Sequence, residues 1–318
     1  MKLLDVKNLN IGFTSDDETL SVVKDVSFSL SKGKLLGIVG ESGCGKSVTL
    51  MSVLGLLPKN AVVKAEYINF CGQNLLNMKE EEIRKIRGNK IALIPQEPLT
   101  SLNPLYTVGD QIMEVITLHQ GVSKKEARKR AVDMLKQVNI PEAEKRIDEY
   151  PHQFSGGMCQ RVIIAMALSC KPDLIIADEP TTALDVTVQA QIMKLFEEIR
   201  QNSDTSIILV THDLALVSEV ADEIIVMYSG EIVEQAPAEE FFKNPKHPYS
   251  KGLLDSLPKD DTNRLNVIEG QPPSIRDNIL GCKFHPRCKD AFEKCILSKP
   301  SLKEVKSGHG VSCWLCGR

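Results

Sequence analysis

The sequence predicts an α/β fold that begins with an antiparallel sheet, carries a helical insertion and ends in a small irregular segment rich in cysteine. Short apolar runs alternate with stretches of helical periodicity, which is the pattern of an α/β core. Strand patterns nearly vanish between residues 97 and 160, where helical patterns replace them. Half of the chain's 16 prolines lie beyond residue 236, which favours an irregular segment over more sheet.

The antiparallel beginning is predicted by the run VSFSL at residues 26–30. Its apolar residues alternate with serines, the period of a half-buried strand, and the turn-forming SKG follows. The core strands are predicted by five later apolar runs, which are LLGIVG, KIALI, LIIAD, SIILVT and EIIVM. A one-face helical spacing at Val188, Ile192, Leu195 and Ile199 is an example of the helices between them.

Composition and charge narrow the class of protein. The 318 residues are 42% hydrophobic and 25% charged, which is ordinary for a globular chain of about two domains. A net charge of −3 gives no overall basic field for nucleic acid. The beginning, MKLLDVKNLN, lacks the apolar core of a secretory signal, and no apolar run reaches transmembrane length, so we expect a soluble cytosolic chain with reduced thiols.

The strongest chemical motif is GESGCGKS at residues 40–47. It follows the apolar run LLGIV and precedes a helical pattern, which is the setting of a phosphate-binding loop. The loop's glycines let backbone N–H groups face a phosphate chain, Lys46 adds a positive charge and Ser47 a hydroxyl for Mg²⁺. A chance glycine-rich turn is the alternative, and the placement of the lysine and serine counts against it. The predicted nucleotide-binding residues here are Gly40, Glu41, Ser42, Gly43, Cys44, Gly45, Lys46, Ser47 and Val48.

Two carboxylates end the predicted strand LIIAD. Asp178 suits the coordination shell of Mg²⁺, and Glu179 could orient or deprotonate an attacking water. An acidic pair at a strand end is often only solvated. Here it completes a set of phosphate-binding, metal-binding and water-activating groups.

Cysteines gather at the end of the chain, in the stretch GCKFHPRCKDAFEKC and beyond. Cys282, Cys288, Cys295 and Cys313 follow C-x5-C-x6-C-x17-C, and four thiolates suit either Zn²⁺ or an iron–sulfur cluster. Zinc knuckles favour C-x2-C spacing, which occurs only in the terminal CWLC, where Cys316 could replace Cys313. Reduced free thiols are the third alternative.

The order of the motifs resembles the nucleotide-binding subunits of ABC transporters over residues 1–235. The phosphate loop is followed by Gln96 after a strand, then by FSGGM, LIIADEP, TTALD and LVTHD. The resemblance implies a P-loop ATPase that binds ATP and Mg²⁺. It also implies roles by position. Phe13 would stack on adenine, and Gln96 would be the Q-loop glutamine that also reaches Mg²⁺. The signature would be formed by Ser155, Gly156 and Gly157, the D-loop aspartate would be Asp185, and the switch histidine would be His212. Glu179, His212 and Gln96 are the implied catalytic residues.

The resemblance also implies how the chain is divided. Residues 1–96 and 161–235 would form a RecA-like ATP-binding core with an antiparallel β subdomain. Residues 97–160 would form the helical signature subdomain, and residues 236–318 a C-terminal domain with the cysteine cluster. Because the signature of one subunit closes over the phosphate loop of another in this family, the chain is expected to work as a homodimer or with a homologous ATPase subunit.

Three further stretches extend the resemblance to the ATPase subunits of dipeptide and oligopeptide importers. They are IPQEPLTSLNP, NPKHPYSKGLL and IEGQPPS. Such a subunit would lie peripherally at the cytoplasmic face of the cell membrane. Its partners would be two transmembrane permease subunits and, indirectly, an extracytoplasmic peptide-binding protein. The alternatives are a nickel or other small-ligand importer, a non-transport ABC ATPase acting on nucleic acid and a metal-sensing module.

The importer resemblance favours a 4Fe-4S cluster over Zn²⁺ for the four cysteines. A small segment with few large apolar side chains rarely buries enough surface to offset chain entropy without a metal or other cross-link. We therefore expect the cluster to stabilise residues 259–318, here called the tail, at a distance from the phosphate loop.

Overall fold

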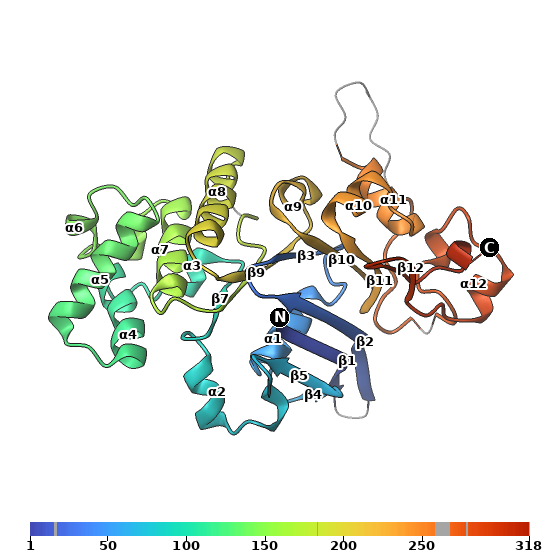
Figure 1. Ribbon diagram of the computed structural model, residues 1–318, viewed down its shortest axis with the longest axis horizontal. Helices are drawn as coiled ribbons and strands as arrows, with labels where there is room; N and C mark the ends of the chain where they lie inside the picture. Colours follow the sequence, from blue (N-terminus) through green and yellow to red (C-terminus); the bar gives the residue numbers. More distant parts are fainter. Residues whose placement is uncertain (16–17, 183, 258–267, 278, 318) are drawn as a thin grey trace. The chain divides into compact units, whose positions relative to one another are not determined.

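The structure is a computed structural model that describes residues 1–15, 18–182, 184–257, 268–277 and 279–317 (Figure 1). The chain forms two compact units. The first joins Met1–Leu76 to Thr211–Arg318, and the second comprises Asn77–Val210. Among the described residues, no helix is long and apolar enough to cross a membrane.

The first unit begins with an antiparallel sheet, as predicted. Two long strands, β1 (Lys2–Ser15) and β2 (Glu18–Ser31), pair along most of their length. β1 also pairs with β4 (Ala61–Lys64) and β5 (Tyr67–Phe70), and β6 (Gln73–Asn74) pairs with β5. The alternation in VSFSL is confirmed, because Val26, Phe28 and Leu30 are buried while the serines between them are partly exposed.

A second sheet of the first unit carries the phosphate loop. β10 (Glu223–Tyr228) pairs in parallel with β3 (Leu35–Val39) and antiparallel with β11 (Glu231–Pro237). Every residue of β3 is buried, which explains its uninterrupted apolar run. Helix α9 (Leu214–Val220) packs against β3, where Gly37 is needed because a Cβ there would lie 2.5 Å from Cγ1 of Val217.

The tail departs in part from the expected irregular segment. Its strands β12 (Lys303–Lys306) and β13 (His309–Val311) join the second sheet, where β13 pairs with β11. The prediction of no further sheet was therefore wrong for these residues, whose short runs are too polar to give a strand pattern. The remaining elements are short: α10 (Ala238–Lys243), α11 (Pro248–Asp255), η3 (His285–Arg287), α12 (Glu293–Leu297) and η4 (Trp314–Gly317).

A buried carboxylate fixes α11 within this unit. Glu234 of β11 is fully buried and accepts hydrogen bonds from the backbone N–H groups of Lys246 and His247, at 2.7 and 2.8 Å. Nε2 of the equally buried His309 lies 2.7 Å from the same carboxylate. His247 caps α11 by accepting from the backbone N–H of Tyr249. The first turn of α11 is thereby held against β11.

The second unit contains three parallel strands and most of the helices. β8 (Leu174–Asp178) pairs with β7 (Ile91–Ile94) and with β9 (Ser206–Thr211). The five core strands predicted from the sequence are thus all present. The helices are α2 (Glu80–Ile86), α3 (Pro98–Ser101), α4 (Val108–Gln120), α5 (Lys124–Gln137), α6 (Ala143–Arg146), η2 (Pro151–Gln153), α7 (Gly156–Leu168) and α8 (Val186–Asn202), with η1 (Leu75–Asn77) at the boundary between the units.

Helices alone occupy the described chain between β7 and β8, and α7 lies at their centre. α3, α4 and α5 all pack against α7, in the green part of Figure 1. Residues from Cys159 to Ala165 of α7 are buried, including the polar Gln160 and Arg161, so this helix is enclosed on nearly all sides. Its N-terminus, which carries the predicted signature, is consequently fixed by packing on several neighbours.

Candidate functional site

The predicted site residues divide between the two units. The phosphate loop, Phe13 and His212 belong to the first unit, whereas Gln96, Asp178, Glu179, the signature and Asp185 belong to the second. Each group is described within its own unit.

The phosphate loop joins β3 to α1 (Lys46–Val53). Gly40 has a φ of +153°, and a Cβ there would lie 2.3 Å from the backbone oxygen of Met227 in β10. Gly45, the N-cap of α1, has a φ of +102°. Both positions require glycine, because side chains are strained at such φ angles. The chance-turn alternative does not explain this close packing against β10.

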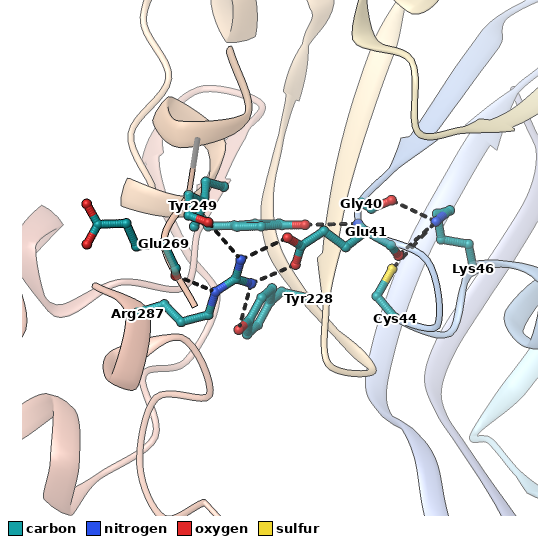
Figure 2. A network of polar contacts seen from close by, with 9 residues as sticks. Gly40, Glu41, Cys44, Lys46, Tyr228, Tyr249, Glu269 and Arg287 are labelled. Carbon is teal, nitrogen blue, oxygen red and sulfur yellow. Dashed lines mark hydrogen bonds and ion pairs between the residues drawn. The ribbon is translucent and has the colours of Figure 1, made fainter. Parts of the chain in front are cut away.

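Lys46 is buried inside the loop, with 4% of its surface exposed. Its Nζ donates to the backbone oxygens of Gly40 at 2.7 Å and Glu41 at 3.0 Å (Figure 2). Ser42 and Gly43 are exposed, and the N-terminus of α1 follows at once. A buried ammonium beside exposed loop backbone and a helix N-terminus favours the binding of a phosphate chain. Ser47 and Val48 lie in the first turn of α1, partly exposed.

Burial also affects Cys44 in this loop. Its thiol is 5% exposed, and desolvation raises its pKa even though the Lys46 ammonium acts in the opposite direction. Cys44 is therefore a packed, protonated thiol at neutral pH. Its Sγ accepts from Lys46 Nζ at 3.9 Å, and its carbonyl accepts from Gly230 N–H at 2.9 Å.

In the second unit the structure brings Gln96 and Glu179 together. Gln96 follows β7, and its Nε2 donates to Oε2 of Glu179 at 3.2 Å. The hydroxyl of Thr182 donates to the same oxygen at 2.9 Å. Asp178, the last residue of β8, is buried at 5% exposure. An amide, a hydroxyl and a carboxylate thus meet next to Asp178 at the C-terminal edge of β7 and β8, where α/β sheets bind their ligands.

The backbone at Glu179 is unusual. Its φ of +46° lies in the left-handed region, which non-glycine residues rarely adopt, and its N–H donates to the oxygen of Val210 in β9 at 2.9 Å. Such local strain is found most often at functional sites. The two side-chain donors, which both reach Oε2, hold the Glu179 carboxylate in place.

The signature residues lie at the start of α7. Ser155 is the N-cap and accepts from the N–H of Met158, at 3.3 Å. A Cβ on Gly157 would lie 2.8 Å from Cγ1 of Val188 in α8, whereas one on Gly156 would meet only Leu184 at 3.9 Å. Asp185 caps α8 and accepts from Val188 N–H at 3.0 Å. The signature and Asp185 therefore occupy two helix N-termini that pack together.

Phe13 and His212 occupy less defined settings. Phe13 is partly buried in β1, opposite Leu20 of β2 and Ala61 of β4, so its assignment to adenine remains a prediction. His212 is exposed between β9 and α9, next to Asp213, which caps α9. Its role near a phosphate also remains a prediction.

The four predicted cluster cysteines line one cavity. Cys282, Cys288, Cys295 and Cys313 surround it, together with His247, His285 and Trp314. Burial raises the pKa of Cys282 to about 11 and that of Cys313 to about 12, and it raises the pKa of Cys288 as well. Cys316 is not among the residues that line this cavity. Within the described ranges, no group of three or more His, Cys, Asp or Glu side chains is arranged to hold a metal ion, so neither zinc nor a cluster is shown.

The tail is not distant from the phosphate loop, which corrects one expectation. Arg287, just before Cys288, pairs with the Glu41 carboxylate at 2.7 and 2.9 Å, and the Tyr249 hydroxyl accepts from the Glu41 N–H at 2.9 Å (Figure 2). Sequence reasoning missed Arg287 and Tyr249 as neighbours of the loop. Arg287 and Glu41 lie 246 positions apart, and no local sequence pattern connects them. Arg287 and Tyr249 do lie in stretches that the sequence analysis quotes, GCKFHPRCKDAFEKC and NPKHPYSKGLL.

Two family models match the chain. Residues 23–182 match the model described as ABC transporter, and residues 233–295 match the model described as Oligopeptide/dipeptide transporter, C-terminal region. The first match contains the phosphate loop, Gln96, the signature, Asp178 and Glu179. The second contains Tyr249, Arg287 and three of the four predicted cluster cysteines.

Curated relatives match over nearly the full length. The chain is 49% identical to the dipeptide transport ATP-binding protein DppD of Bacillus subtilis, over 99% of this chain and 95% of that protein. It is 49% identical to the oligopeptide transport ATP-binding protein OppD of Haemophilus influenzae, over 98% of this chain and 97% of that protein. It is 47% identical to DppD of Escherichia coli, over 98% of this chain and 96% of that protein.

Solved structures of ATP-binding cassettes share the fold. A dimeric post-hydrolysis state of the cassette MJ0796 bound to ADP and Pi is 28% identical, with a TM-score of 0.66 over 74% of this chain and 98% of that one. CbiO1 of Clostridium perfringens, part of the transporter complex cbiONQ, is 27% identical, with a TM-score of 0.64 over 76% of this chain and 91% of that one. The chain therefore belongs to the ABC transporter ATPases and, within them, to the ATP-binding proteins of dipeptide and oligopeptide transport.

Proposed function

We propose that this chain is the ATP-hydrolysing subunit that powers uptake of di- or oligopeptides through a membrane ABC importer. The observation that carries the proposal is that the chain matches both the ABC transporter model and the peptide-transporter C-terminal model. Its relatives in dipeptide and oligopeptide transport also match over nearly their full length. The phosphate loop and the held carboxylate of Glu179 supply the chemistry that ATP hydrolysis needs.

The residues divide the work of hydrolysis by their chemistry. The loop from Gly40 to Val48 binds the phosphates, and Lys46 neutralises their charge. Ser47, Gln96 and Asp178 would hold Mg²⁺ through oxygen ligands, which this ion prefers. Glu179 orients the attacking water and accepts its proton, while His212 contacts the terminal phosphate. Phe13 stacks on the adenine ring.

Closure of the site requires a second ATPase subunit. The start of α7 presents backbone N–H groups and a helix dipole, which form a second anion site separate from the phosphate loop in the sequence. Ser155, Gly156, Gly157 and Asp185 would act on the nucleotide held by the partner, a copy of this chain or a homologous subunit. The dimeric structures of MJ0796 support this arrangement by analogy.

The remaining partners follow from the importer assignment. Two transmembrane permease subunits would bind the helical region of residues 97–160, which places the ATPase at the cytoplasmic face of the membrane. The core of residues 1–96 and 161–235 would supply the ATP chemistry, and residues 236–318 the peptide-importer domain. An extracytoplasmic binding protein would deliver the peptide, and nucleic acid has no role.

We also propose that the cysteine cavity holds a 4Fe-4S cluster. A single Zn²⁺ needs four ligand atoms within about 2.3 Å of one point, whereas a cluster distributes its cysteine ligands over several irons. The side chain of His247 is evidence that the cavity holds a bound group. Its Nδ1 accepts from Tyr249 N–H, so its Nε2 carries the proton, and this buried donor at the cavity has no partner among the described residues. A cluster's thiolates and sulfides are suitable acceptors.

The cluster proposal is tested on protein purified without oxygen. We expect a brown protein with iron and acid-labile sulfide, lost in Cys288→Ser but kept in a Cys71→Ser control, since Cys71 lies exposed near β5. Stoichiometric zinc without sulfide would support the zinc alternative. If the protein contains neither iron nor zinc, the cysteines are reduced free thiols, which is the third alternative.

The import function is tested by ATP hydrolysis in the complex reassembled with permease subunits and binding protein. We expect dipeptides or oligopeptides to stimulate hydrolysis, and Lys46→Ala to abolish the stimulated rate. Stimulation by Ni²⁺ and not by peptides would favour the small-ligand importer. Stimulation by DNA or RNA without the permeases would refute transport.

A further inference from the structure

Arg287 forms a complete set of hydrogen bonds next to the phosphate loop (Figure 2). A guanidinium has five N–H donors in a fixed fork. Two of them reach the two carboxylate oxygens of Glu41, at 2.7 and 2.9 Å. The others reach the hydroxyl of Tyr228 at 3.4 Å and the backbone oxygens of Glu269 at 3.1 Å and Ile268 at 3.5 Å. A lysine could not reproduce this geometry.

Burial strengthens the pair between Arg287 and Glu41. The Arg287 side chain is only 5% exposed, and the Glu41 side chain 28%. The carboxylate and the Tyr228 hydroxyl raise the pKa of Arg287 above its ordinary value, so its charge is permanent. A bidentate, partly desolvated pair of this kind is among the stronger charge-assisted contacts in proteins.

Glu41 is held at three points, two of them by groups outside the loop. Its carboxylate meets Arg287, its N–H donates to Tyr249 Oη at 2.9 Å, and its carbonyl accepts from Lys46 Nζ at 3.0 Å. The conformation of Glu41 therefore fixes one of the two carbonyls that position the Lys46 ammonium. Arg287 and Tyr249 act on Lys46 through this residue.

Tyr249 is itself fixed by its surroundings. It is fully buried, and its ring lies 4.7 Å from that of Tyr228 and 5.3 Å from that of Phe284, measured between centroids. Burial raises the pKa of Tyr249, so the hydroxyl stays neutral and accepts the Glu41 N–H. The anchor at Glu234 holds the turn of α11 that carries Tyr249. The contact to the loop is thus backed by packed side chains.

Charge gives the pair a second consequence. Glu41 places a carboxylate within a loop whose ligand is a polyanion, and an unpaired carboxylate there would repel phosphate. Arg287 neutralises it through both oxygens. Loss of Arg287 would leave the carboxylate uncompensated, in addition to freeing the loop.

We propose that Arg287 and Tyr249 are positioning residues for nucleotide binding, through which the cysteine-rich tail sets the affinity of the phosphate loop for ATP. The proposal rests on the proposed role of this loop. Because Arg287 lies between Cys282 and Cys288, the order of the tail and the geometry of the loop are linked by one side chain.

The experiment measures the affinity of the full chain for a fluorescent ATP analogue with Mg²⁺, together with the melting temperature. We expect Arg287→Ala to weaken binding by about tenfold or more, and Tyr249→Phe by several-fold, because it removes one hydroxyl and keeps the packed ring. Lys289→Ala is the matched control: it removes a positive charge from the same segment, where Lys289 is 79% exposed and pairs with Glu269. It should bind like the wild type.

A double-mutant cycle separates positioning from general stability. Glu41→Gln combined with Arg287→Ala should bind more tightly than Arg287→Ala alone, because the repelling carboxylate is gone. Wild-type affinity in both Arg287→Ala and Tyr249→Phe, with lowered melting temperatures, would reduce these residues to structural supports and overturn the proposal. Additive effects of Glu41→Gln and Arg287→Ala would also overturn it. Failure of the wild type to bind ATP would instead refute the role of the loop.

Discussion

Lys46 is a buried positive charge whose nearest partners in the loop are the backbone carbonyls of Gly40 and Glu41, with Cys44 Sγ farther away at 3.9 Å. Carbonyls are weaker partners for an ammonium than phosphate oxygens, because phosphate carries full negative charge. The same side chain can therefore exchange its acceptors when a nucleotide enters. Its position in the loop makes it the residue whose loss should affect binding most.

We predict that Lys46→Ala lowers ATP affinity on the order of 10- to 100-fold, the value of a charge-assisted hydrogen bond. Calorimetric titration of the variant measures this loss. Lys59→Ala is the control, since it removes an exposed lysine from the same unit. Unchanged affinity in Lys46→Ala would exclude the loop as the phosphate site.

Single residues show where sequence reasoning reaches its limit. Gln96 and Glu179 were predicted to serve one site, and their side chains do meet. Glu179 was predicted from its place at the end of an apolar strand pattern, whereas Gln96 was predicted from the family resemblance. The bond between Arg287 and Glu41 depends on how the tail folds back, and nothing in either residue's neighbourhood encodes it. The left-handed backbone of Glu179 was likewise absent from any sequence pattern.

At the scale of elements, the close approach of Gly157 at the start of α7 to Val188 of α8 determines which signature variant is informative. Any side chain at Gly157 would meet Val188 at 2.8 Å and disturb the chain's own packing, whereas Gly156 has room for one. Gly156→Asp therefore places a negative charge at the anion site of the helix N-terminus with little internal strain.

We predict that a Lys46→Ala chain mixed with a Gly156→Asp chain regains hydrolysis that neither has alone. In the mixed dimer, the intact phosphate loop of one chain faces the intact signature of the other. Hydrolysis is measured at constant total protein, and each variant mixed with itself is the control. No regained activity, although mixed dimers form, would contradict action of the signature across the interface.

The anchor of α11 supports another prediction. Glu234→Ala would leave two backbone N–H groups and His309 without their buried acceptor. We expect the free energy of unfolding to fall by about 3–5 kcal/mol, as for other broken buried pairs. Denaturant titration measures it, with Glu239→Ala as the control, because the Glu239 pair with Lys243 is exposed and should contribute nothing measurable. Equal stability of the two variants would contradict the anchor.

Elements with strong periodicity were predicted well, and the others were not. The five apolar core runs and α8 are where the sequence places them, because burial on both faces or on one leaves a clear pattern. β12 and β13 escaped prediction, since four exposed residues in β12 carry no such pattern and the pairing of β13 with β11 is long-range.

At the scale of the whole molecule, the lysine proposed to bind phosphate and the carboxylate proposed to activate water belong to different compact units. Lys46 lies in the first unit, and Glu179, held by Gln96 and Thr182, lies in the second. A change in the second unit should therefore leave the phosphate loop unaltered. Variants of Lys46 and Glu179 are therefore expected to affect ATP binding and ATP hydrolysis separately.

The measurement that tests this account most directly is the ATP affinity and turnover of Glu179→Gln, determined on one preparation of the reassembled complex. The amide keeps the shape of the side chain but cannot accept a proton from water. We predict wild-type affinity for ATP with Mg²⁺ and a turnover lowered about 10²- to 10⁴-fold, the usual contribution of a general base. Wild-type turnover in Glu179→Gln would contradict the account.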